Sequence, residues 1–308
     1  MDEFKNLKSY ITKYQLGSTL DNVSFKCLTS LKIGGTCKLM YIPDDIESLD
    51  LVIKYMIVLK IPYFIIGSGT NLLVNDREFD IVVVSLKNIK RHYILKEDKD
   101  NIYIYVESGA KAPIVSTYIA RKGIGGAEFL SGIPGSMGGL IYMNAGAYKK
   151  SIEDIIDTVT YIDDKGDIQT ISNQHNNLHF SYRHSIFQDY NYVILSCIIK
   201  LPKIKYAEDP QIKIKRFLDI KKESQPLDTY NAGSTFKNND SPAWMIIDQL
   251  GYRGYRINDA MVSTKHANFL INNGNATFLD MMMLIEMIKY DAKTKLNIEM
   301  KCEWEIIE

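Results

Sequence analysis

The sequence predicts an α+β protein with two α/β segments, followed by a C-terminal segment in which helices and strands alternate. Three observations predict this class. Stretches of helical and of strand period are interspersed, polar stretches near residues 90–100 and 202–210 divide the chain, and glycine-rich segments interrupt the apolar runs. A chain of 308 residues is long enough for two or three domains. We therefore predict three domains, at residues 1–90, 91–203 and 204–308.

The first segment predicts a small α/β unit. Thr29–Gly35 has the pattern of a strand that ends in a glycine turn, and Tyr63–Ile66 and Ile81–Val84 are short apolar strands. Between them a helix is predicted after Asp44 and Asp45, which can cap its start. Its apolar residues recur at helical spacing: Leu49, Val52, Ile53 and Met56.

The second segment continues with a strand at Ile102–Val106 and a helix at Ile114–Arg121. Lys165–Asp167, with its central glycine, predicts a hairpin turn. In the third segment we expect one helix with Ser241 as its N-cap and another that starts near Thr277.

The C-terminal stretch 298–306 alternates apolar and polar residues, as a strand does. Its apolar face consists of Ile298, Met300, Cys302, Trp304 and Ile306.

The composition excludes several classes of function. Lysine plus arginine and aspartate plus glutamate both number 37, so no long-range field attracts a polyanion, and nucleic-acid binding is not predicted. The apolar runs are shorter than the ~18 residues of a membrane span, and the start of the chain lacks a signal-peptide pattern. The cysteines form no Cys-x-x-Cys pair, so we expect no metal site. We therefore expect a cytoplasmic monomer that binds neither nucleic acid nor a membrane.

The first glycine-rich segment, Gly67-Ser-Gly-Thr-Asn71, is similar to a dinucleotide fingerprint but departs from it. Leu72 occupies the position of the third glycine, and the residues that follow lack a helical pattern. The segment is therefore not a Rossmann turn. Its glycines still permit a close approach of backbone N–H groups to a pyrophosphate, although a tight turn without a ligand would have the same residues.

The second segment, Ser131-Gly-Ile-Pro-Gly-Ser-Met-Gly-Gly139, contains four glycines and two serines. A regular strand or helix would not use so many glycines, because each costs ~0.5–1 kcal/mol relative to alanine. Its neighbours Phe129, Leu130, Leu140 and Ile141 are apolar, which favours a buried loop over a flexible surface loop. Two such segments suit a long cofactor with a diphosphate bridge.

Together the two segments resemble the FAD-binding domain of the vanillyl-alcohol-oxidase (PCMH-type) flavoproteins. Four further motifs narrow the resemblance: Tyr182-Arg-His-Ser185, Gln225-Pro226, Asn231-Ala-Gly-Ser-Thr-Phe-Lys-Asn238 and Val262-Ser-Thr-Lys-His-Ala-Asn-Phe269. From about Thr29 to its end the chain resembles the UDP-N-acetylenolpyruvoylglucosamine reductases of peptidoglycan precursor synthesis. The resemblance implies two FAD-binding subdomains and a C-terminal α+β substrate domain.

The resemblance also implies the reaction. Non-covalent FAD takes a hydride from NADPH and passes it to the β-carbon of UDP-N-acetylglucosamine enolpyruvate, and an acid then protonates the α-carbon. In the family this acid is the serine of Ala-Gly-Ser, here Ser234. The arginine of the Tyr-Arg motif, here Arg183, and a glutamate near the C-terminus, here Glu303, stabilise the enolate-like intermediate.

We expect further residues to bind the cofactor and the substrate. The cofactor residues are Gly67, Ser68, Gly69, Thr70, Asn71, Leu72, Ser131, Gly132, Ile133, Gly135, Ser136, Gly139, Asn144 and Gly146. The substrate residues are Tyr182, Gln225, Lys237 and Asn238. His266 lies in a family motif but receives no role.

Two departures from the family pattern are visible. The family has a small aliphatic residue and then a basic residue after the glutamate, where this chain has Trp304 and Glu305. The interval between Arg183 and Ser234 is too short for the substrate-capping tyrosine loop of one branch of the family, so another segment must shield the site. Two alternatives stay open: a related FAD oxidase of an alcohol or sugar, and a flavin- or UDP-sugar-binding protein without catalysis.

Overall fold

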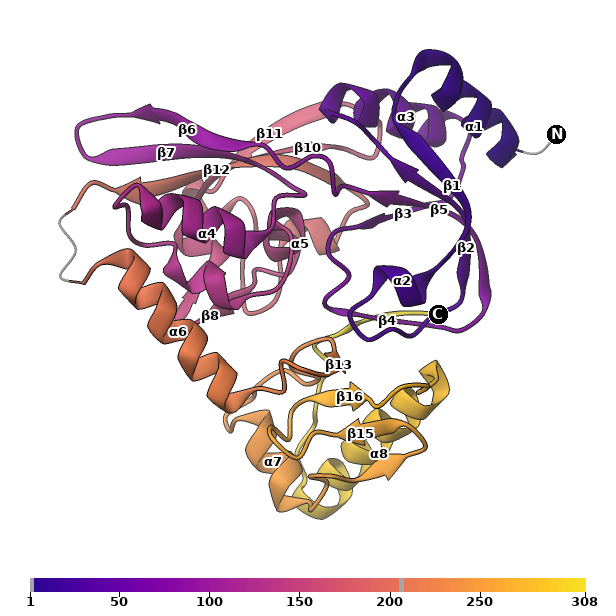
Figure 1. Cartoon of the computed structure of the whole chain (residues 1–308), viewed down its shortest axis with the longest axis vertical. Helices are drawn as coiled ribbons and strands as arrows, with labels where there is room; N and C mark the ends of the chain where they lie inside the picture. The colour runs from indigo at the N-terminus through magenta and orange to yellow at the C-terminus, as the bar shows by residue number, and fades with distance from the viewer. Residues whose placement is uncertain (1–2, 205–207) are drawn as a thin grey trace. The chain divides into compact units, whose positions relative to one another are not determined.

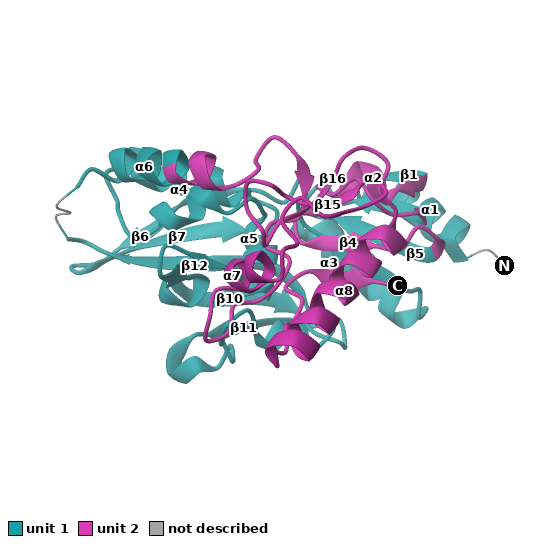
Figure 2. Ribbon diagram, turned by 90° about the horizontal axis from the view of Figure 1, so that it is seen from below, with its two compact units in different colours: residues 1–21, 38–68, 80–219 teal, residues 22–37, 69–79, 220–308 magenta. Residues whose placement is uncertain are grey.

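The computed structural model describes residues 3–204 and 208–308, and it confirms the α+β class (Figure 1). The chain divides into two compact units, both discontinuous in sequence (Figure 2). Unit 1 comprises residues 1–21, 38–68 and 80–219, and unit 2 comprises residues 22–37, 69–79 and 220–308. The predicted division at residues 90 and 203 concerns three domains and stays a prediction. The polar stretch 202–210 includes residues 205–207, which lie outside the described residues.

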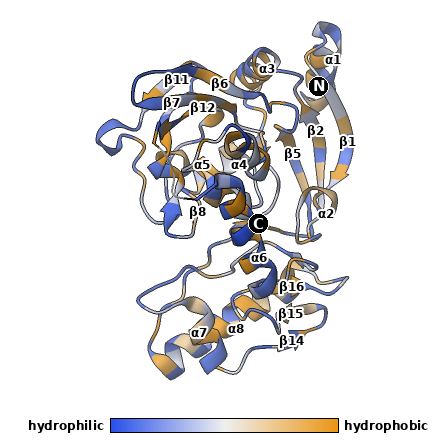
Figure 3. Ribbon diagram, turned by 60° about the vertical axis from the view of Figure 1, so that its left-hand side comes forward, coloured by the Kyte–Doolittle hydropathy of each residue, from blue (hydrophilic) through white to orange (hydrophobic). Residues whose placement is uncertain are grey.

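Unit 1 begins with a four-stranded sheet, whose order is β1 (Ser18–Ser24), β2 (Thr36–Ile42), β5 (Glu78–Ser85) and β3 (Tyr63–Ile66). Strands β3 and β5 run parallel. The border between the units passes through β1, β2 and β5, whereas β3 lies entirely in unit 1. Helices α1 (Glu3–Tyr14) and α3 (Ile46–Val58) bury Leu7, Leu49 and Met56 against this sheet. Along β2, exposed Lys38 stands between buried Cys37 and Leu39. Figure 3 shows that hydrophilic and hydrophobic residues both occur along this strand.

A second, antiparallel sheet follows in unit 1. Its order is β11 (Ile168–Ser172), β10 (Ile156–Ile162), β12 (Val193–Pro202), β7 (Asn101–Glu107) and β6 (His92–Glu97). Helices α4 (Ala112–Arg121) and α5 (Met137–Tyr142) cover one face (Figure 1). The core of the first sheet extends to Ile162 and Val193 of the second sheet, while the rest of the second sheet has a hydrophobic core of its own under α4 and α5.

Unit 2 contains a short antiparallel sheet, whose order is β13 (Tyr230–Asn231), β16 (Leu270–Asn272), β15 (Ala260–Val262) and β14 (Arg256–Ile257). Helices α7 (Ala243–Gln249) and α8 (Phe278–Leu296) pack with it. β17 (Glu305–Ile307) pairs in parallel with β4 (Leu72–Val74). Leu31, Ile33 and Leu73 from the N-terminal part of the chain complete the core of this unit.

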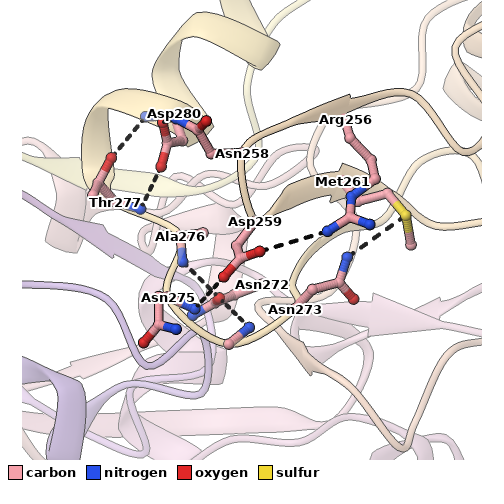
Figure 4. Close-up of polar contacts among 11 residues, drawn as sticks. Arg256, Asn258, Asp259, Met261, Asn272, Asn273, Asn275, Ala276, Thr277 and Asp280 are labelled. Carbon is pink, nitrogen blue, oxygen red and sulfur yellow. Dashed lines mark hydrogen bonds and ion pairs between the residues drawn. The ribbon is translucent and has the colours of Figure 1, made fainter.

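A network of polar side chains ties the sheet of unit 2 to α8 (Figure 4). Thr277 and Asp280 cap α8 reciprocally, and Asn258 donates to Asp280 over 2.7 Å. Burial would raise the pKa of Asp280, but the hydrogen bonds from Thr277 and Asn258 hold it below its ordinary value. Asn272 accepts two backbone N–H groups of its own turn and donates to the carbonyl of Leu31 over 2.9 Å. The turn is thereby fixed to a segment far away in the sequence.

Several predicted elements are confirmed. The Asp45 carboxylate accepts the N–H of Ser48 and caps α3, and Thr277 caps α8. The strands Tyr63–Ile66, Ile81–Val84 and Ile102–Val106 lie within β3, β5 and β7, and the helix Ile114–Arg121 lies within α4. The hairpin turn has Gly166 at φ +89°, a conformation that suits glycine.

Two predicted elements are wrong near glycine or proline. Thr29–Gly35 is not a strand but an irregular turn after α2 (Phe25–Leu28), because Lys32 and Gly34 have φ of +59° and +129°. Ser241 is not the N-cap of α7. Pro242 occupies that position, and the first free N–H, of Ala243, donates to Oδ1 of Asn238 over 3.0 Å.

Two further predictions are wrong in part. The glycine-rich segment is not all loop, since η1 (Glu128–Gly132) and α5 occupy much of it. The predicted C-terminal strand 298–306 shrinks to β17 and a single bridge at Cys302, although the expected burial of Met300 and Trp304 is present.

Candidate active site

The two glycine-rich segments meet at Gly67 and Ser136, both in unit 1. A Cβ atom on Gly67 would lie 2.2 Å from Oγ of Ser136, and one on Gly139 would lie 3.5 Å from the same oxygen. Gly67 follows β3, and Ser136 precedes α5 and is 3% exposed. A larger residue at 67 would therefore require the Ser136 hydroxyl to move.

The loop after Gly67 leads from unit 1 into unit 2. Among the residues that the structure describes, none accepts the backbone N–H of Ser68 or Gly69, so both are available to a ligand. Gly69 has φ +62°, and a Cβ there would lie 2.0 Å from the carbonyl oxygen of Leu28. Its carbonyl accepts the N–H of Ser30 over 2.9 Å. Close packing of two backbones thus explains the second glycine.

The segment 131–139 is held by backbone contacts on its inner side. The N–H of Gly138 donates to the carbonyl of Ser108 over 2.7 Å, and the carbonyl of Gly135 accepts the N–H of Ala112 over 3.0 Å. The Ser131 hydroxyl donates to the carbonyl of Glu128 over 2.7 Å, and Ile133 is the C-cap residue of η1. These contacts fix the segment and leave the exposed Gly139 on its outer side.

The side-chain amide of Asn144 hydrogen-bonds within the protein through both its nitrogen and its oxygen. It is 2% exposed and has φ +40°. Nδ2 donates to the carbonyl of Ser181 over 2.9 Å, and Oδ1 accepts the N–H of Glu153 over 3.2 Å. A cofactor contact of this side chain therefore stays a prediction, while its role in holding the 181 turn is visible.

Arg183 is presented by that turn, which closes through hydrogen bonds between Ser181 and His184. Arg183 has φ +56°, and one guanidinium nitrogen donates to the carbonyl of Gly146 over 3.3 Å. Its guanidinium carbon lies 5.0 Å from the ring centre of Tyr182, which is 51% exposed. The Tyr-Arg pair is thus displayed at the surface of unit 1, next to the predicted cofactor residue Gly146.

The side chains of Ser185 and Gln188 hold the turn that carries Arg183. Ser185 Oγ and Gln188 Nε2 both donate to the carbonyl of Tyr142 over 2.7 Å. Gln188 also donates to the carbonyl of Arg183 over 3.2 Å. Sequence reasoning missed both residues, although Ser185 stands in the motif that contains Arg183.

In unit 2, Ser234 lies on a loop whose start is shaped by Asn231. The Asn231 side chain donates to the carbonyl of Pro226 over 3.0 Å and accepts the N–H of Gly233, whose φ is +76°. Ser234 is half-buried, and its hydroxyl makes no hydrogen bond to any residue that the structure describes. The hydroxyl is therefore available to a ligand.

The segment after Ser234 pairs with the C-terminal stretch. Glu303 N–H donates to the carbonyl of Thr235 over 2.7 Å, and Lys237 N–H donates to the carbonyl of Lys301 over 2.8 Å. Phe236 and Cys302 face each other between these bonds. This register brings Glu303 beside the residue that follows Ser234, so the structure brings these two predicted catalytic residues together.

Asn71 of the first glycine segment brackets the same stretch. Its Nδ2 donates to the carbonyl of Glu303 over 3.1 Å, and its own carbonyl accepts the N–H of Glu305 over 2.9 Å. Asn71 therefore positions the C-terminal glutamates, a role that the sequence analysis missed because it expected a cofactor contact.

Glu305, two residues after Glu303, is half-buried and is influenced by the charge of Lys237. Burial raises the pKa of the Glu305 carboxyl, and the positive charge of Lys237 partly opposes this shift. The net effect of burial and of this charge is a raised pKa for Glu305.

The remaining predicted residues have mixed positions. Asn238 caps α7 with its side-chain oxygen, and Gln225 is half-buried at the end of α6 (Pro210–Ser224). His266 accepts the N–H of Asn268 through Nδ1 over 3.2 Å and packs edge-on against Phe269. Its pKa is lowered by burial and by the charge of Arg253. These contacts are those of a packed and hydrogen-bonded histidine.

Asn268 is a buried residue that sequence reasoning passed over. It is 3% exposed, and its side chain both accepts the N–H and donates to the carbonyl of Phe236, each over 2.9 Å. Its backbone carbonyl accepts the N–H of Thr235 over 2.8 Å. It lies in the quoted motif 262–269, which was the available signal.

Two family descriptions match the chain: "FAD binding domain" over residues 37–172 and "UDP-N-acetylenolpyruvoylglucosamine reductase, C-terminal domain" over residues 225–307. The UDP-N-acetylenolpyruvoylglucosamine reductase of Caldanaerobacter subterraneus subsp. tengcongensis is 39% identical over 287 residues, which cover 93% of this chain and 92% of that protein. The chain belongs to the UDP-N-acetylenolpyruvoylglucosamine reductase family.

Other members of this family match the chain along nearly their whole length. The Thermotoga maritima reductase is 38% identical over 283 residues, which cover 91% of this chain and 95% of that protein. The crystal structure of the Thermus caldophilus reductase superposes with a TM-score of 0.79 at 27% identity and covers 94% of this chain and 98% of that chain. The resemblance and the FAD-binding fold predicted from the motifs are thus confirmed.

The residues present fit the flavin dinucleotide of this family. A diphosphate needs unengaged N–H donors that it can approach closely, and the stretch Gly67–Gly69 supplies them beside Ser136. The binding of the cofactor by Gly67–Leu72 and by residues 131–139 stays a prediction.

Proposed function

We propose that Arg183, Ser234 and Glu303 carry out the reaction of this family member, the reduction of UDP-N-acetylglucosamine enolpyruvate to UDP-N-acetylmuramate with NADPH. When bound, FAD supplies a hydride, taken from NADPH, to the β-carbon of the enolpyruvyl double bond. The remaining requirement is a proton at the α-carbon, which the protein must deliver.

Ser234 is proposed as the donor of that proton. Its hydroxyl is half-buried and is engaged by none of the described residues, so it can turn toward a substrate. An alcohol is a weak acid, and it donates only to a strongly basic carbon that lies within hydrogen-bond reach. The pairing of Glu303 N–H with the carbonyl of Thr235 is the observation that carries this proposal, because it fixes the carboxylate-bearing residue beside the serine.

Arg183 and Glu303 are proposed to stabilise the charge that develops after hydride addition. A guanidinium offers a planar fork for a carboxylate, and donors that are oriented before the reaction stabilise developing charge most strongly. The turn that holds Arg183, through Ser185 and Gln188, supplies such orientation in unit 1. Tyr182, Gln225, Lys237 and Asn238 are proposed to contact the substrate.

The chain is further proposed to act as a monomer in the cytoplasm, without nucleic acid or a membrane. One chain supplies all three proposed catalytic residues, and its 37 basic and 37 acidic residues balance. Within residues 3–204 and 208–308, no helix is both long and apolar enough to cross a bilayer. Light scattering after gel filtration measures the oligomeric state.

The test is NADPH oxidation by the purified flavoprotein, with and without UDP-N-acetylglucosamine enolpyruvate. We expect oxidation that depends on the enolpyruvate, and Ser234→Ala should lower its rate ~10²–10⁴-fold, the usual loss for a general acid. Reduction of the flavin by NADPH should persist in the variant. A fully active Ser234→Ala would refute the assignment of the acid, and oxygen consumption indifferent to enolpyruvate would favour the oxidase.

A further inference from the structure

Helix α6 rests on unit 1 through few contacts. Its first ten residues belong to that unit, and only Pro210 of the whole helix is buried. Ile212 and Leu218 are 62% and 43% exposed. A helix with so little buried apolar surface is held by whichever specific contacts it makes.

The main contact is an aromatic stack between Tyr148 and Phe217. The ring centres lie 3.8 Å apart at an interplanar angle of 5°, and the Tyr148 hydroxyl donates to the carbonyl of Phe217 over 2.6 Å. The stack and the hydrogen bond join the same two residues, so their relative position is closely defined.

Tyr148 also contacts the glycine-rich segment. A Cβ on Gly132 would lie 3.2 Å from Cε2 of Tyr148, so the ring lies directly on this glycine. Tyr148 has φ +54°, an unfavourable conformation for a tyrosine that its surroundings must maintain. Tyr148 therefore contacts both Gly132 and Phe217.

A second contact reaches the start of the same segment. Lys213 Nζ lies 3.5 Å from a carboxylate oxygen of Glu128, which is 3% exposed and accepts the N–H of Gly126 over 2.9 Å. Glu128 begins η1 and Gly132 ends it. Helix α6 is thus attached at both ends of η1.

We propose that Tyr148 and Phe217 are a positioning pair, which holds the first half of α6 as a cover over the cofactor segment 131–139. Through Phe217, α6 places an aromatic ring on Tyr148, next to the segment. Excluding water from the flavin strengthens the electrostatic interactions around it and prevents side reactions of the reduced cofactor. The inference rests on the cofactor assignment within the proposed function.

The experiment uses the FAD-loaded enzyme and measures collisional quenching of the flavin fluorescence by iodide. Phe217→Ala removes the outer ring, and we expect the quenching constant to rise roughly threefold or more as the flavin becomes accessible. Reoxidation of the reduced flavin by oxygen should accelerate in the same variant. Phe217→Tyr keeps the stacked ring and should restore both values to those of the native enzyme.

Leu218→Ala is the matched control, because it removes an exposed apolar side chain from the neighbouring position of α6. A folded Phe217→Ala enzyme with native quenching and reoxidation would overturn the proposal, as would an equal effect of Leu218→Ala. If Phe217→Ala does not fold, Phe217→Leu keeps the apolar bulk, loses the planar ring and carries the same expectation. A native enzyme that holds FAD but does not reduce the enolpyruvate would count against the proposed function, while the quenching comparison stays valid.

Discussion

Arg183 and Ser234 are presented by two different kinds of support. The Arg183 turn has left-handed backbone and depends on individual side chains, which are Asn144, Ser185 and Gln188. The Ser234 loop is continuous with a backbone ladder, in which residues 235–237 pair with 301–303. A ladder survives most side-chain substitutions because its donors and acceptors are peptide groups, whereas a turn held by side chains can be lost by one substitution. The arginine should therefore be the easier of the two to misplace.

The largest effect should come from Arg183→Lys, which keeps the charge and removes the planar fork. We expect kcat/KM for the enolpyruvate to fall by about 10²-fold or more, the scale of one lost oxyanion donor. Arg121→Lys, at the exposed end of α4, is the matched control. Steady-state kinetics that show equal activity for Arg183→Lys would mean that only its charge is used.

Asn268→Ala tests whether the ladder side has its own weak point. The substitution leaves the buried N–H and carbonyl of Phe236 without partners, and each costs about 1–3 kcal/mol. The free energy of unfolding in urea should fall by about 2–4 kcal/mol. Asn275→Ala, at an exposed position of the same unit, should change it little. An unchanged midpoint for Asn268→Ala would show that water replaces the lost partners.

Asn144→Ala tests the turn directly. Loss of the amide frees Ser181 and disfavours the left-handed backbone, so the guanidinium should lose its orientation. We expect kcat to fall about 10-fold while bound FAD is retained, since a small misplacement of a catalytic group lowers the rate strongly. Flavin content and kcat measured on one preparation separate this outcome from loss of the cofactor, which would restore the predicted ligand role of Asn144.

The smallest effect concerns pH and the half-buried carboxyl of Glu305. Because burial raises the pKa of Glu305 in the folded state, folding binds a proton between the unfolded and folded pKa values, and stability falls as pH rises through this window. Glu305→Gln removes that loss, so the variant should be more stable than native at neutral pH, by about 1 kcal/mol or less. Thermal unfolding at acid and neutral pH measures the difference, which should shrink in acid. The exposed Glu299→Gln is the control, and a variant less stable than native at neutral pH would mean that the interaction with the charge of Lys237 is net favourable.

The elements that sequence patterns predicted best are those with local causes. The caps Asp45 and Thr277 and the turn at Gly166 depend on neighbouring residues alone, and all three are present. The strand predicted at Thr29–Gly35 failed because Leu31 and Ile33 are buried in a core whose other residues lie mostly far away in the sequence. Local apolar pattern cannot distinguish a strand from a turn that is buried by another segment.

The site divides in the same way. Motifs identified Ser234 and Glu303, and the structure places them beside each other through pairing that no local pattern encodes. The supporting roles of Asn71, Asn268 and Gln188 were not predicted. In a sequence, a residue whose side chain hydrogen-bonds to a distant backbone cannot be distinguished from one that contacts a ligand. Such roles become visible only in the structure.

The composite nature of unit 2 has a consequence for biosynthesis. The carbonyl of Leu31 receives its hydrogen bond from Asn272, a residue 241 positions later. At a translation rate of roughly 5–20 residues per second, the apolar side chains of Leu31 and Ile33 wait about 10–50 s on the ribosome before their partners emerge. During that interval this apolar N-terminal stretch is exposed on the nascent chain, where it can bind chaperones or aggregate with other chains.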